Sequence, residues 1–226
     1  MRGTHKKILI LGGTREAVDC AKSLVAQGHD VTTSLAGRTR EPHPVSGNIR
    51  TGGFGGVEGL AAYLLENHID QLIDMTHPFA LQISKNAKAA ALKTGIEFIA
   101  HQRPQWEKMD GDNWLEVATI DDAVTDIPTG AIVLLALGSQ HIAPFAARAD
   151  VHFIVRMVDP PLAPLNLPDH ELILAKPGAM EEEYALLQAR KITCIVCRNS
   201  GGEGAYTKIA AARLLGIKVI MLKRAV

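Results

Sequence analysis

The chain has 226 residues, and its 24 basic and 24 acidic side chains give a formal net charge of zero. This balance argues against nucleic acid as a partner, because the phosphates of nucleic acids call for an excess of basic residues. Hydrophobic residues make up 47% of the chain but aromatic residues only 4%. A core built mainly from Ala, Val, Ile and Leu is typical of buried parallel strands that are covered by helices.

The cysteine content favours a reducing compartment. The three cysteines are too few, and odd in number, for a disulfide framework. Cys194 and Cys197 form a C-x-x-C pair inside an expected strand, where side chains three residues apart point to opposite faces. We interpret them as two buried apolar residues in preference to a redox or zinc site. No other spacing of His, Cys, Asp or Glu is typical of a metal site.

No stretch of the sequence approaches the roughly 18 apolar residues of a membrane-spanning helix. The N-terminal apolar run, residues 8–11, ends at Gly12 and is too short for the core of a signal peptide. We expect a cytoplasmic protein, a monomer or a weak oligomer, with neither a membrane nor a nucleic acid as partner. An acidic small molecule stays open as a ligand, because local Arg, Lys and His can bind it.

The first half of the chain alternates between short apolar runs and amphipathic segments. This alternation predicts β-α-β units, and hence a parallel sheet with helices on its faces. Strands are expected at residues 7–11, 30–35, 49–51, 71–74 and 96–100, and helices at residues 15–27, 57–67 and 79–94.

A connector at residues 103–112 leads to a second half with the same alternation, which includes a proline-rich loop at residues 159–168. We expect an α/β fold of two Rossmann-like lobes with parallel sheets and a cleft between them. The first, dinucleotide-binding lobe is expected at residues 1–104 and the second α/β lobe at residues 105–226. Further strands are expected at residues 131–137, 151–157, 171–175, 193–197 and 218–222, and helices at residues 121–126, 142–148, 181–190 and 206–215.

The segment between the first strand and its helix is a candidate phosphate-binding loop. Free backbone N–H groups at this turn and the helix dipole both favour an anion. The usual G-x-G-x-x-G/A pattern is met in part, because Thr14 stands at the second glycine while Ala17 fits the last position. The Thr14 hydroxyl could donate to a phosphate oxygen; a tight turn without a ligand is the alternative. The expected cofactor-binding residues here are Gly12, Gly13, Thr14 and Arg15.

The end of the second expected strand favours NADPH over NADH as cofactor. NAD-selective sites carry an acidic residue here for the ribose hydroxyls, and this sequence has none. Arg38 and Arg40 would instead attract a 2′-phosphate, and Ser34 could donate a hydrogen bond to it. The expected cofactor-binding residues here are Ser34, Gly37 and Arg38. The alternative for the two arginines is a pair of solvated loop cations.

Residues 74–78, with the sequence DMTHP, follow the fourth expected strand at the edge where α/β sheets bind ligands. Thr76 can cap the next helix and Pro78 can open it, which would explain both residues without a ligand. Thr76 is also a candidate cofactor contact. His77 is a candidate catalytic residue, in contact with cofactor or substrate and available as a proton donor.

Residues 52–56, with the sequence GGFGG, carry four glycines around one aromatic residue. Such a segment permits close approach of the backbone to a ligand. Gly53 is therefore expected to contact the cofactor, and Phe54 to pack on a flat substrate ring. The alternatives are a flexible turn and a core aromatic residue.

Residues 198–202, RNSGG, repeat the geometry of the first loop, since they follow one expected strand and precede a helix. Their cationic and polar groups could bind the acidic side chains of a substrate, and Ser200 is, with His77, a candidate catalytic residue. A glycine-rich turn without a ligand is the alternative. The expected substrate-binding residues are Phe54, Arg198, Asn199, Ser200, Gly201 and Lys208.

Seven motifs occur in order along the chain: LGGTREA (11–17), SLAGRT (34–39), GGFGG (52–56), DMTHPFA (74–80), RPQW (103–106), GDNW (111–114) and NSGG (199–202). This combination resembles the precorrin-6A reductase and cobalt-precorrin-6A reductase family over nearly the whole chain. The resemblance implies two Rossmann-like lobes and an NADP-dependent oxidoreductase that acts on CH–CH groups. It further implies reduction of one double bond of the precorrin-6A macrocycle by NADPH, giving precorrin-6B (dihydroprecorrin-6A) in cobalamin biosynthesis.

The sequence departs from the family pattern at three places. Arg198 stands where the family usually has Lys, which weakens any role as general acid because a guanidinium does not readily release a proton. Residues 176–180 replace a Gly-Pro-Phe segment, and the chain ends in residues 223–226 where the family often has Arg-Pro. Whether the macrocycle carries cobalt is left open.

Two other classes of protein share parts of this pattern. A non-catalytic NADP(H) sensor would need only the first loop and Arg38, and it would leave the motifs of the second half unexplained. A short-chain dehydrogenase requires a Tyr-x-x-x-Lys pair, which this chain lacks. Four positions after Tyr63, Tyr184 and Tyr206 stand Asn67, Gln188 and Ala210.

Overall fold

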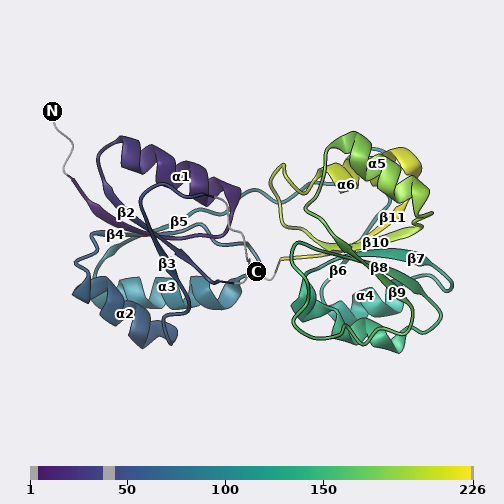
Figure 1. Cartoon of the computed structure of the whole chain (residues 1–226), viewed down its shortest axis with the longest axis horizontal. Coiled ribbons are helices and arrows are strands. Elements are labelled where there is room, and N and C mark those ends of the chain that lie inside the picture. Colours follow the sequence, from purple (N-terminus) through teal and green to yellow (C-terminus); the bar gives the residue numbers. More distant parts are fainter. Residues whose placement is uncertain (1–4, 38–43, 225–226) are drawn as a thin grey trace. The chain divides into compact units, whose positions relative to one another are not determined.

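The chain folds into two compact units, residues 1–102 and 103–226. The computed structural model describes residues 5–37 and 44–224, and Figure 1 traces the chain. Each unit contains a parallel sheet that carries helices on both faces. The predicted α/β class with two parallel sheets is thereby confirmed.

The first unit consists, in chain order, of β1 (Lys7–Leu11), α1 (Arg15–Ala26), β2 (Asp30–Leu35), β3 (Asn48–Thr51), α2 (Gly56–Glu66), β4 (Gln71–Asp74), α3 (Leu81–Thr94) and β5 (Glu97–Ala100). Its five strands are parallel and lie in the order β3-β2-β1-β4-β5. Helix α1 covers one face of the sheet, and α2 and α3 cover the other (Figure 1).

Alternation along β1 divides the core of the first unit between the two faces of the sheet. Ile8 and Ile10 pack with buried alanines of α1, whereas Leu9 and Leu11 pack with buried residues of α2 and α3. Successive side chains of a strand point to opposite faces. A continuous apolar run therefore serves both helical layers and leaves no polar side chain in the middle of the strand.

The second unit consists of β6 (Trp114–Val117), α4 (Ile120–Asp126), β7 (Ile132–Ala136), the 3₁₀ helices η1 (Ser139–His141) and η2 (Ala143–Ala147), β8 (His152–Met157), β9 (His170–Leu174), α5 (Met180–Ala189), β10 (Cys194–Arg198), α6 (Thr207–Leu215) and β11 (Lys218–Leu222). Its six strands are parallel, in the order β6-β11-β10-β7-β8-β9. Helices α5 and α6 lie on one face and α4 on the other (Figure 1).

Two elements of the second unit differ from the sequence-based expectation. The sequence does not predict β6, because Leu115 and Glu116 in its middle are exposed at the sheet edge and no apolar run marks the strand. The helix expected at residues 142–148 is wrong, since that segment holds the short helix η2 directly after η1. One continuous α-helix would place Pro144 in its interior, where the missing N–H and the ring disrupt helical hydrogen bonding.

The helices are short relative to a bilayer. The longest described helix, α3, has 14 residues. Within residues 5–37 and 44–224, none of the helices combines the length and the apolar character that crossing a membrane requires.

The C-x-x-C pair lies inside β10 and is buried. Burial raises the pKa of the Cys194 thiol to about 12, and burial also raises the pKa of Cys197. Both thiols are therefore protonated at neutral pH, whereas redox and zinc sites use the thiolate. In the part of the chain that the structure describes, no group of three or more His, Cys, Asp or Glu side chains is arranged to hold a metal ion.

Each sheet contains a point where the connections of two neighbouring strands leave in opposite directions. In the first sheet this point lies between β1 and β4, and in the second between β7 and β10. Open α/β sheets bind ligands outside the carboxyl ends of the strands that flank such a point. The loops that follow these four strands are therefore where a site is expected within each unit.

A buried ion pair connects the second sheet to α5. Arg156 of β8 donates through Nη1 to Glu183 Oε1 at 2.6 Å, and the two side chains are 5% and 3% exposed. The backbone N–H of Gly178 donates to the same carboxylate oxygen at 2.9 Å. Nη2 of Arg156 and Oε2 of Glu183 are buried with no hydrogen-bond partner among the described residues. Removal of either charge would leave the other one buried and uncompensated.

Glu183→Ala is therefore expected to lower the free energy of unfolding by about 3–5 kcal/mol. Glu181 is exposed in the same turn of α5, and Glu181→Ala, the matched control, is expected to change it by less than about 0.5 kcal/mol. Urea denaturation followed by circular dichroism measures both values. The double variant Arg156→Met with Glu183→Leu is expected to recover much of the lost stability. Equal stability of Glu183→Ala and Glu181→Ala would contradict the ion pair's role.

Candidate functional site

The loop after β1 is tied to the ends of its two neighbouring strands. Gly12 donates its backbone N–H to the carbonyl of Ser34 at 2.9 Å. The Thr14 hydroxyl accepts the N–H of Ala17 at 3.2 Å, which caps α1, and donates to the carbonyl of Met75 at 2.8 Å. The expected donation from this hydroxyl to a phosphate does not fit these contacts, because its one proton already has an acceptor inside the protein.

The backbone of the same loop retains free donors. None of the described residues accepts a hydrogen bond from the backbone N–H of Gly13, Thr14 or Arg15. These groups stand at the start of the 12-residue helix α1, whose dipole favours negative charge there. Gly13 has a φ of 112°, a conformation open to glycine but strained for other residues. The arrangement is suited to a phosphate group.

At the end of β2, the expected hydrogen-bond donor Ser34 has an arginine partner that is not among the residues expected from the sequence. Arg50 of β3 is the register partner of Ser34 and donates to its hydroxyl at 3.2 Å. Gly37 follows with a φ of 73°, whereas Arg38 and Arg40 lie outside the described residues. The signal that could have revealed Arg50 is its place near the carboxyl end of the neighbouring strand.

The glycine-rich segment after β3 is organised around the same arginine. Arg50 donates to the carbonyl oxygens of Gly52 at 2.6 Å and Gly53 at 2.7 Å. Its guanidinium carbon lies 3.7 Å from the centre of the Phe54 ring, and that ring packs edge-on against Tyr63 with 5.2 Å between centres. Phe54 thus has an arginine and a tyrosine as neighbours within the first unit, and packing on a substrate ring stays a prediction.

In the segment after β4, Thr76 serves the loop and does not cap the helix. The Asp74 carboxylate accepts the backbone N–H of Thr76 at 3.0 Å and its hydroxyl at 2.7 Å. Helix α3 begins at Leu81, with Ala80 before it and no side-chain cap. The helix therefore begins two residues later than the expected residue 79, and Thr76 does not cap it. The Asp74 carboxylate accepts the Thr76 hydroxyl instead, and the N–H of Ala80 donates to the His77 carbonyl in a turn before the helix.

His77 is partly exposed in this turn. Its Nδ1 accepts the backbone N–H of Phe79 at 3.3 Å, and the two rings lie 5.9 Å apart. An imidazole that accepts at Nδ1 and is neutral carries its proton on Nε2. A neutral His77 with this contact would carry its proton on Nε2, and its role as a proton donor stays a prediction.

In the second unit, the loop after β10 is built on an asparagine–tryptophan pair. Asn199, which is 2% exposed, accepts the backbone N–H of Trp106 at 2.8 Å and donates to the Trp106 carbonyl at 2.9 Å. The Trp106 indole N–H donates to the carbonyl of Gly202 at 2.7 Å. Asn199 therefore shapes the loop from a buried position, and its expected contact with substrate stays a prediction.

Arg224, which is not among the site residues expected from the sequence, also holds this loop. Its guanidinium donates to the carbonyl oxygens of Asn199 at 2.9 Å, Ser200 at 2.8 Å, Arg103 at 2.7 Å and Pro104 at 3.4 Å. Burial lowers the pKa of Arg224, and the charge of Arg103 lowers it further. One side chain thus joins the RPQW segment to the NSGG segment.

Ser200 and Arg198 lie together at the carboxyl end of β10. The Ser200 hydroxyl donates to the carbonyl of Arg198 at 3.2 Å. Burial lowers the pKa of the Arg198 guanidinium. His141 of η1, which follows β7, also has a lowered pKa, first because it is partly buried and second because of the charge of Arg198. The loops on both sides of the second switch point therefore contribute basic groups.

Lys208 is buried, whereas a residue that contacts substrate would be expected at the surface. It is 3% exposed, donates to the carbonyl of Ala205, and its Nζ lies 4.9 Å from the centre of the Trp106 ring. Burial lowers its pKa, while the neighbouring Cys197 and Glu183 act in the opposite direction. Lys208 therefore supports the loop from within α6, and direct binding of substrate stays a prediction.

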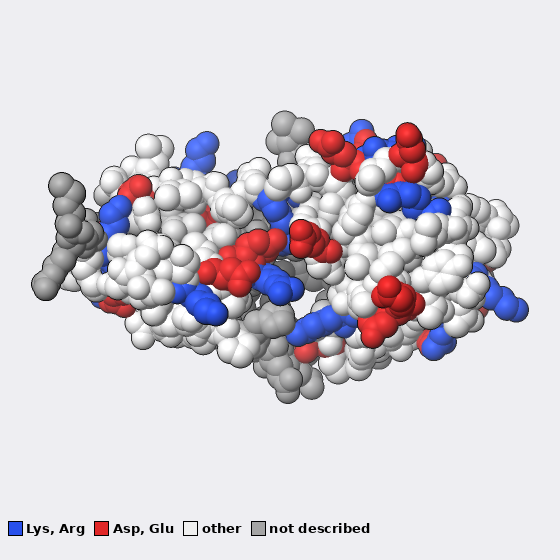
Figure 2. Space-filling model, turned by 90° about the horizontal axis from the view of Figure 1, so that it is seen from above, with Lys and Arg blue, Asp and Glu red and all other residues white. Residues whose placement is uncertain are grey.

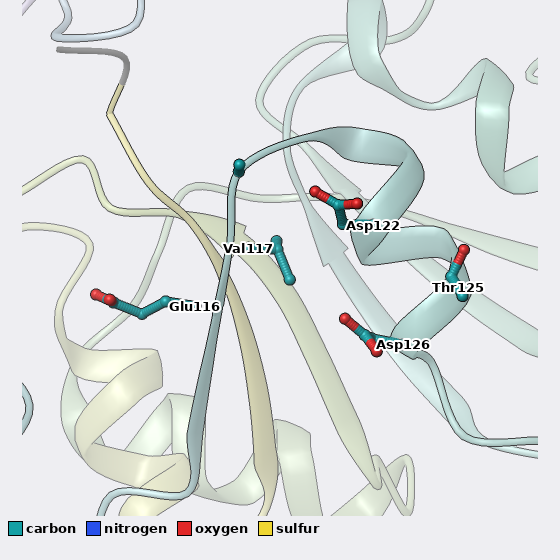
Figure 3. A pocket seen from close by; sticks show the side chains of 6 residues that line it. Glu116, Val117, Asp122, Thr125 and Asp126 are labelled. Atoms are coloured by element: carbon teal, nitrogen blue, oxygen red, sulfur yellow. The ribbon is translucent and has the colours of Figure 1, made fainter.

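A cavity of about 340 Å³ lies between β6 and α4. Figure 3 shows Asp122 and Asp126 on α4, and Glu116 on the strand, directed away from them. Carboxylates would repel an anionic ligand, so this cavity is unsuited to a phosphate or an acidic substrate. On the face that Figure 2 shows, acidic and basic side chains are interspersed.

The parallel sheets, the switch points and the glycine-rich turns define a Rossmann-like α/β protein. Within that class, the chain belongs to the precorrin-6x reductase CbiJ/CobK family, which matches residues 7–226. This assignment agrees with the resemblance that the ordered motifs indicate.

Three relatives illustrate the family. The precorrin-6A reductase of Sinorhizobium sp is 47% identical over 221 residues, which are 96% of this chain and 85% of that protein. The solved structure of CobK precorrin-6A reductase is 43% identical, with a TM-score of 0.94, and the match covers 98% of this chain and 89% of that chain. The cobalt-precorrin-6A reductase of Priestia megaterium is 28% identical and matches 96% of this chain and 90% of its own length.

Gly201 offers a direct test of the NSGG loop. Its φ is 66°, and a Cβ atom there would lie 2.0 Å from the carbonyl oxygen of Pro104 and 2.5 Å from an Arg224 Nη2. Gly201→Ala is therefore expected to lower the free energy of unfolding by about 1–3 kcal/mol. Gly204 in the same loop has open space around its Cβ position, so Gly204→Ala is the control. A urea midpoint for Gly201→Ala as high as that of the control would contradict the proposed packing.

Proposed function

We propose that this protein is an NADPH-dependent precorrin-6A reductase of cobalamin biosynthesis, acting in the cytoplasm. It would reduce one double bond of the precorrin-6A macrocycle and give dihydroprecorrin-6A. The observation that carries the proposal is the row of backbone N–H groups at the first switch point that find no acceptor among the described residues. They occur in a chain that is 47% identical to a precorrin-6A reductase.

The residues of the first unit fit the phosphate groups of a dinucleotide. The backbone N–H groups of Gly13, Thr14 and Arg15 would hold the pyrophosphate, with Gly12 and Gly13 keeping side chains out of its way. Gly53 and Thr76, on the loops after β3 and β4, are proposed as further cofactor contacts. When bound, NADPH supplies the reducing equivalent, so the protein's task is to bind and orient it.

The 2′-phosphate would be recognised at the end of β2. Ser34 and Gly37 stand there, and Arg38 follows in sequence. A guanidinium matches the oxygens of a phosphate by paired hydrogen bonds, and no carboxylate is present in residues 34–40 to repel it.

The acidic side chains of the macrocycle would be bound by the second unit. Arg198, Ser200 and Gly201 lie in the loop after β10, where basic and backbone groups suit carboxylates. Lys208, which is buried in α6 beneath the loop, is proposed as a further basic group, and burial lowers its pKa. Phe54, in the first unit, is proposed to pack on the flat ring.

Reduction of a carbon–carbon double bond also needs a proton at the adjacent carbon. His77 is the proposed donor, because its Nε2 carries the proton when Nδ1 accepts from Phe79. Ser200 is the second candidate in the expected site, although its hydroxyl donates to the Arg198 carbonyl in this structure. Arg198 itself is unsuited, since a guanidinium retains its proton.

The metal-free macrocycle is the favoured substrate. The relative at 47% identity is named precorrin-6A reductase, whereas the relative at 28% is named cobalt-precorrin-6A reductase. Similarity thus supports the form without cobalt.

Incubation of the purified protein with precorrin-6A and NADPH tests the proposal. We expect NADPH absorbance to fall with one reduced macrocycle formed per cofactor oxidised, and little oxidation when NADH replaces NADPH. Mass spectrometry of the macrocycle checks that two hydrogens have been added. Absence of turnover with both the metal-free and the cobalt form would refute the reductase and would favour a non-catalytic NADP(H) sensor.

A further inference from the structure

Arg50 has an environment that loop support alone does not explain. It is the residue before the last one of β3 and the register partner of Ser34 in β2. Because parallel strands end at the same edge, its side chain lies beside the end of β2, where dinucleotide-binding sheets hold the adenosine ribose. The motif GGFGG and the resemblance both leave this arginine without a role.

The guanidinium of Arg50 is held in one orientation. Its Nη1 donates to the Ser34 hydroxyl at 3.2 Å and to the Gly52 carbonyl at 2.6 Å, and its Nη2 donates to the Gly53 carbonyl at 2.7 Å. The Phe54 ring lies against it, with 3.7 Å from the guanidinium carbon to the ring centre. Such fixation removes much of the side-chain entropy that an arginine would otherwise lose when it binds a ligand.

The charge of Arg50 has no acidic partner in the part of the chain that the structure describes. Among residues 5–37 and 44–224, no carboxylate forms an ion pair with it; its partners are a hydroxyl and two carbonyl oxygens. The guanidinium also has more N–H donors than these three acceptors use. The Ser34 hydroxyl accepts from Arg50, and none of the described residues accepts its proton, so this proton can be donated to a ligand.

We propose that Arg50 is a specificity-determining residue that, together with Ser34, binds the 2′-phosphate of the cofactor's adenosine. A cation with unused donors and a hydroxyl with an unused proton, neither of them paired with a carboxylate of residues 5–37 or 44–224, form a site for a phosphate dianion. This inference rests on the proposed use of NADPH. It assigns part of the selectivity to a residue on β3, in addition to the arginines expected after β2.

Binding measurements with the full chain test this inference. Arg50→Gln and Arg50→Lys are compared with wild type by calorimetric titration with NADPH, NADH, 2′,5′-ADP and 5′-AMP. We expect Arg50→Gln to bind NADPH and 2′,5′-ADP about tenfold or more weakly, as loss of a charge-assisted hydrogen bond implies. NADH and 5′-AMP should change less than about twofold. Arg50→Lys, which keeps the charge but not the planar fork, should fall between.

The matched control is Lys88→Gln, which removes an exposed cation of α3 and should leave all four affinities unchanged. Equal losses for NADPH and NADH in Arg50→Gln would overturn the inference, because a role restricted to holding the loop affects both cofactors alike. Should Arg50→Gln fail to fold, Arg50→Lys decides with 2′,5′-ADP alone: a loss of about threefold supports the inference, and an unchanged affinity refutes it.

The two proposals fail in different ways. If wild type binds NADPH no better than NADH, the cofactor proposal fails and the inference falls with it. If wild type prefers NADPH and Arg50→Gln keeps that preference, only the role of Arg50 is refuted. Turnover of precorrin-6A with NADPH remains a separate readout of the proposed function.

Discussion

Parallel strands that are buried on both faces confine polar chemistry to the ends of the strands. In β1 and β10 nearly every side chain is apolar and packed against helices. Polar groups with freedom to meet a ligand can therefore occur only where the strands stop. The carboxyl edge of the sheet is the end suited to binding a ligand, because helices begin there and present their unpaired N–H groups. The candidate residues of both units follow from this one constraint.

Glycine-rich loops at such an edge need support, because glycine gives close approach to a ligand but little conformational order. In each unit an arginine from outside the loop supplies this support. Arg50 donates hydrogen bonds to the carbonyl oxygens of Gly52 and Gly53, and Arg224 donates to those of Asn199 and Ser200. A guanidinium suits this role because it offers several donors in one rigid plane. These contacts use the carbonyl oxygens of the loops. They therefore leave the backbone N–H groups that a ligand needs available.

Periodicity predicted most of the fold, because long apolar runs such as the one in β7 and amphipathic segments such as α1 are local signals. It failed where tertiary context decides. The edge strand β6 has exposed residues in its middle, and α3 starts three residues after Pro78 because Asp74 holds the Thr76 hydroxyl. For the site, position along the chain indicated the correct loops. Position along the chain could not indicate that the Thr14 hydroxyl donates to the Met75 carbonyl. Nor could it indicate that Arg224 and Trp106 donate hydrogen bonds to the NSGG segment. These contacts join residues that are far apart in sequence.

The central claim is that the N–H groups at the start of α1 bind the phosphates of the cofactor. Amide chemical shifts of the ¹⁵N-labelled chain during titration with NADPH test it most directly. The account predicts that the amides of Gly13, Thr14 and Arg15 shift as they gain an acceptor, while Gly95, whose N–H is already bonded within α3, stays in place. Saturation of the protein with NADPH while these three amides keep their positions would contradict it.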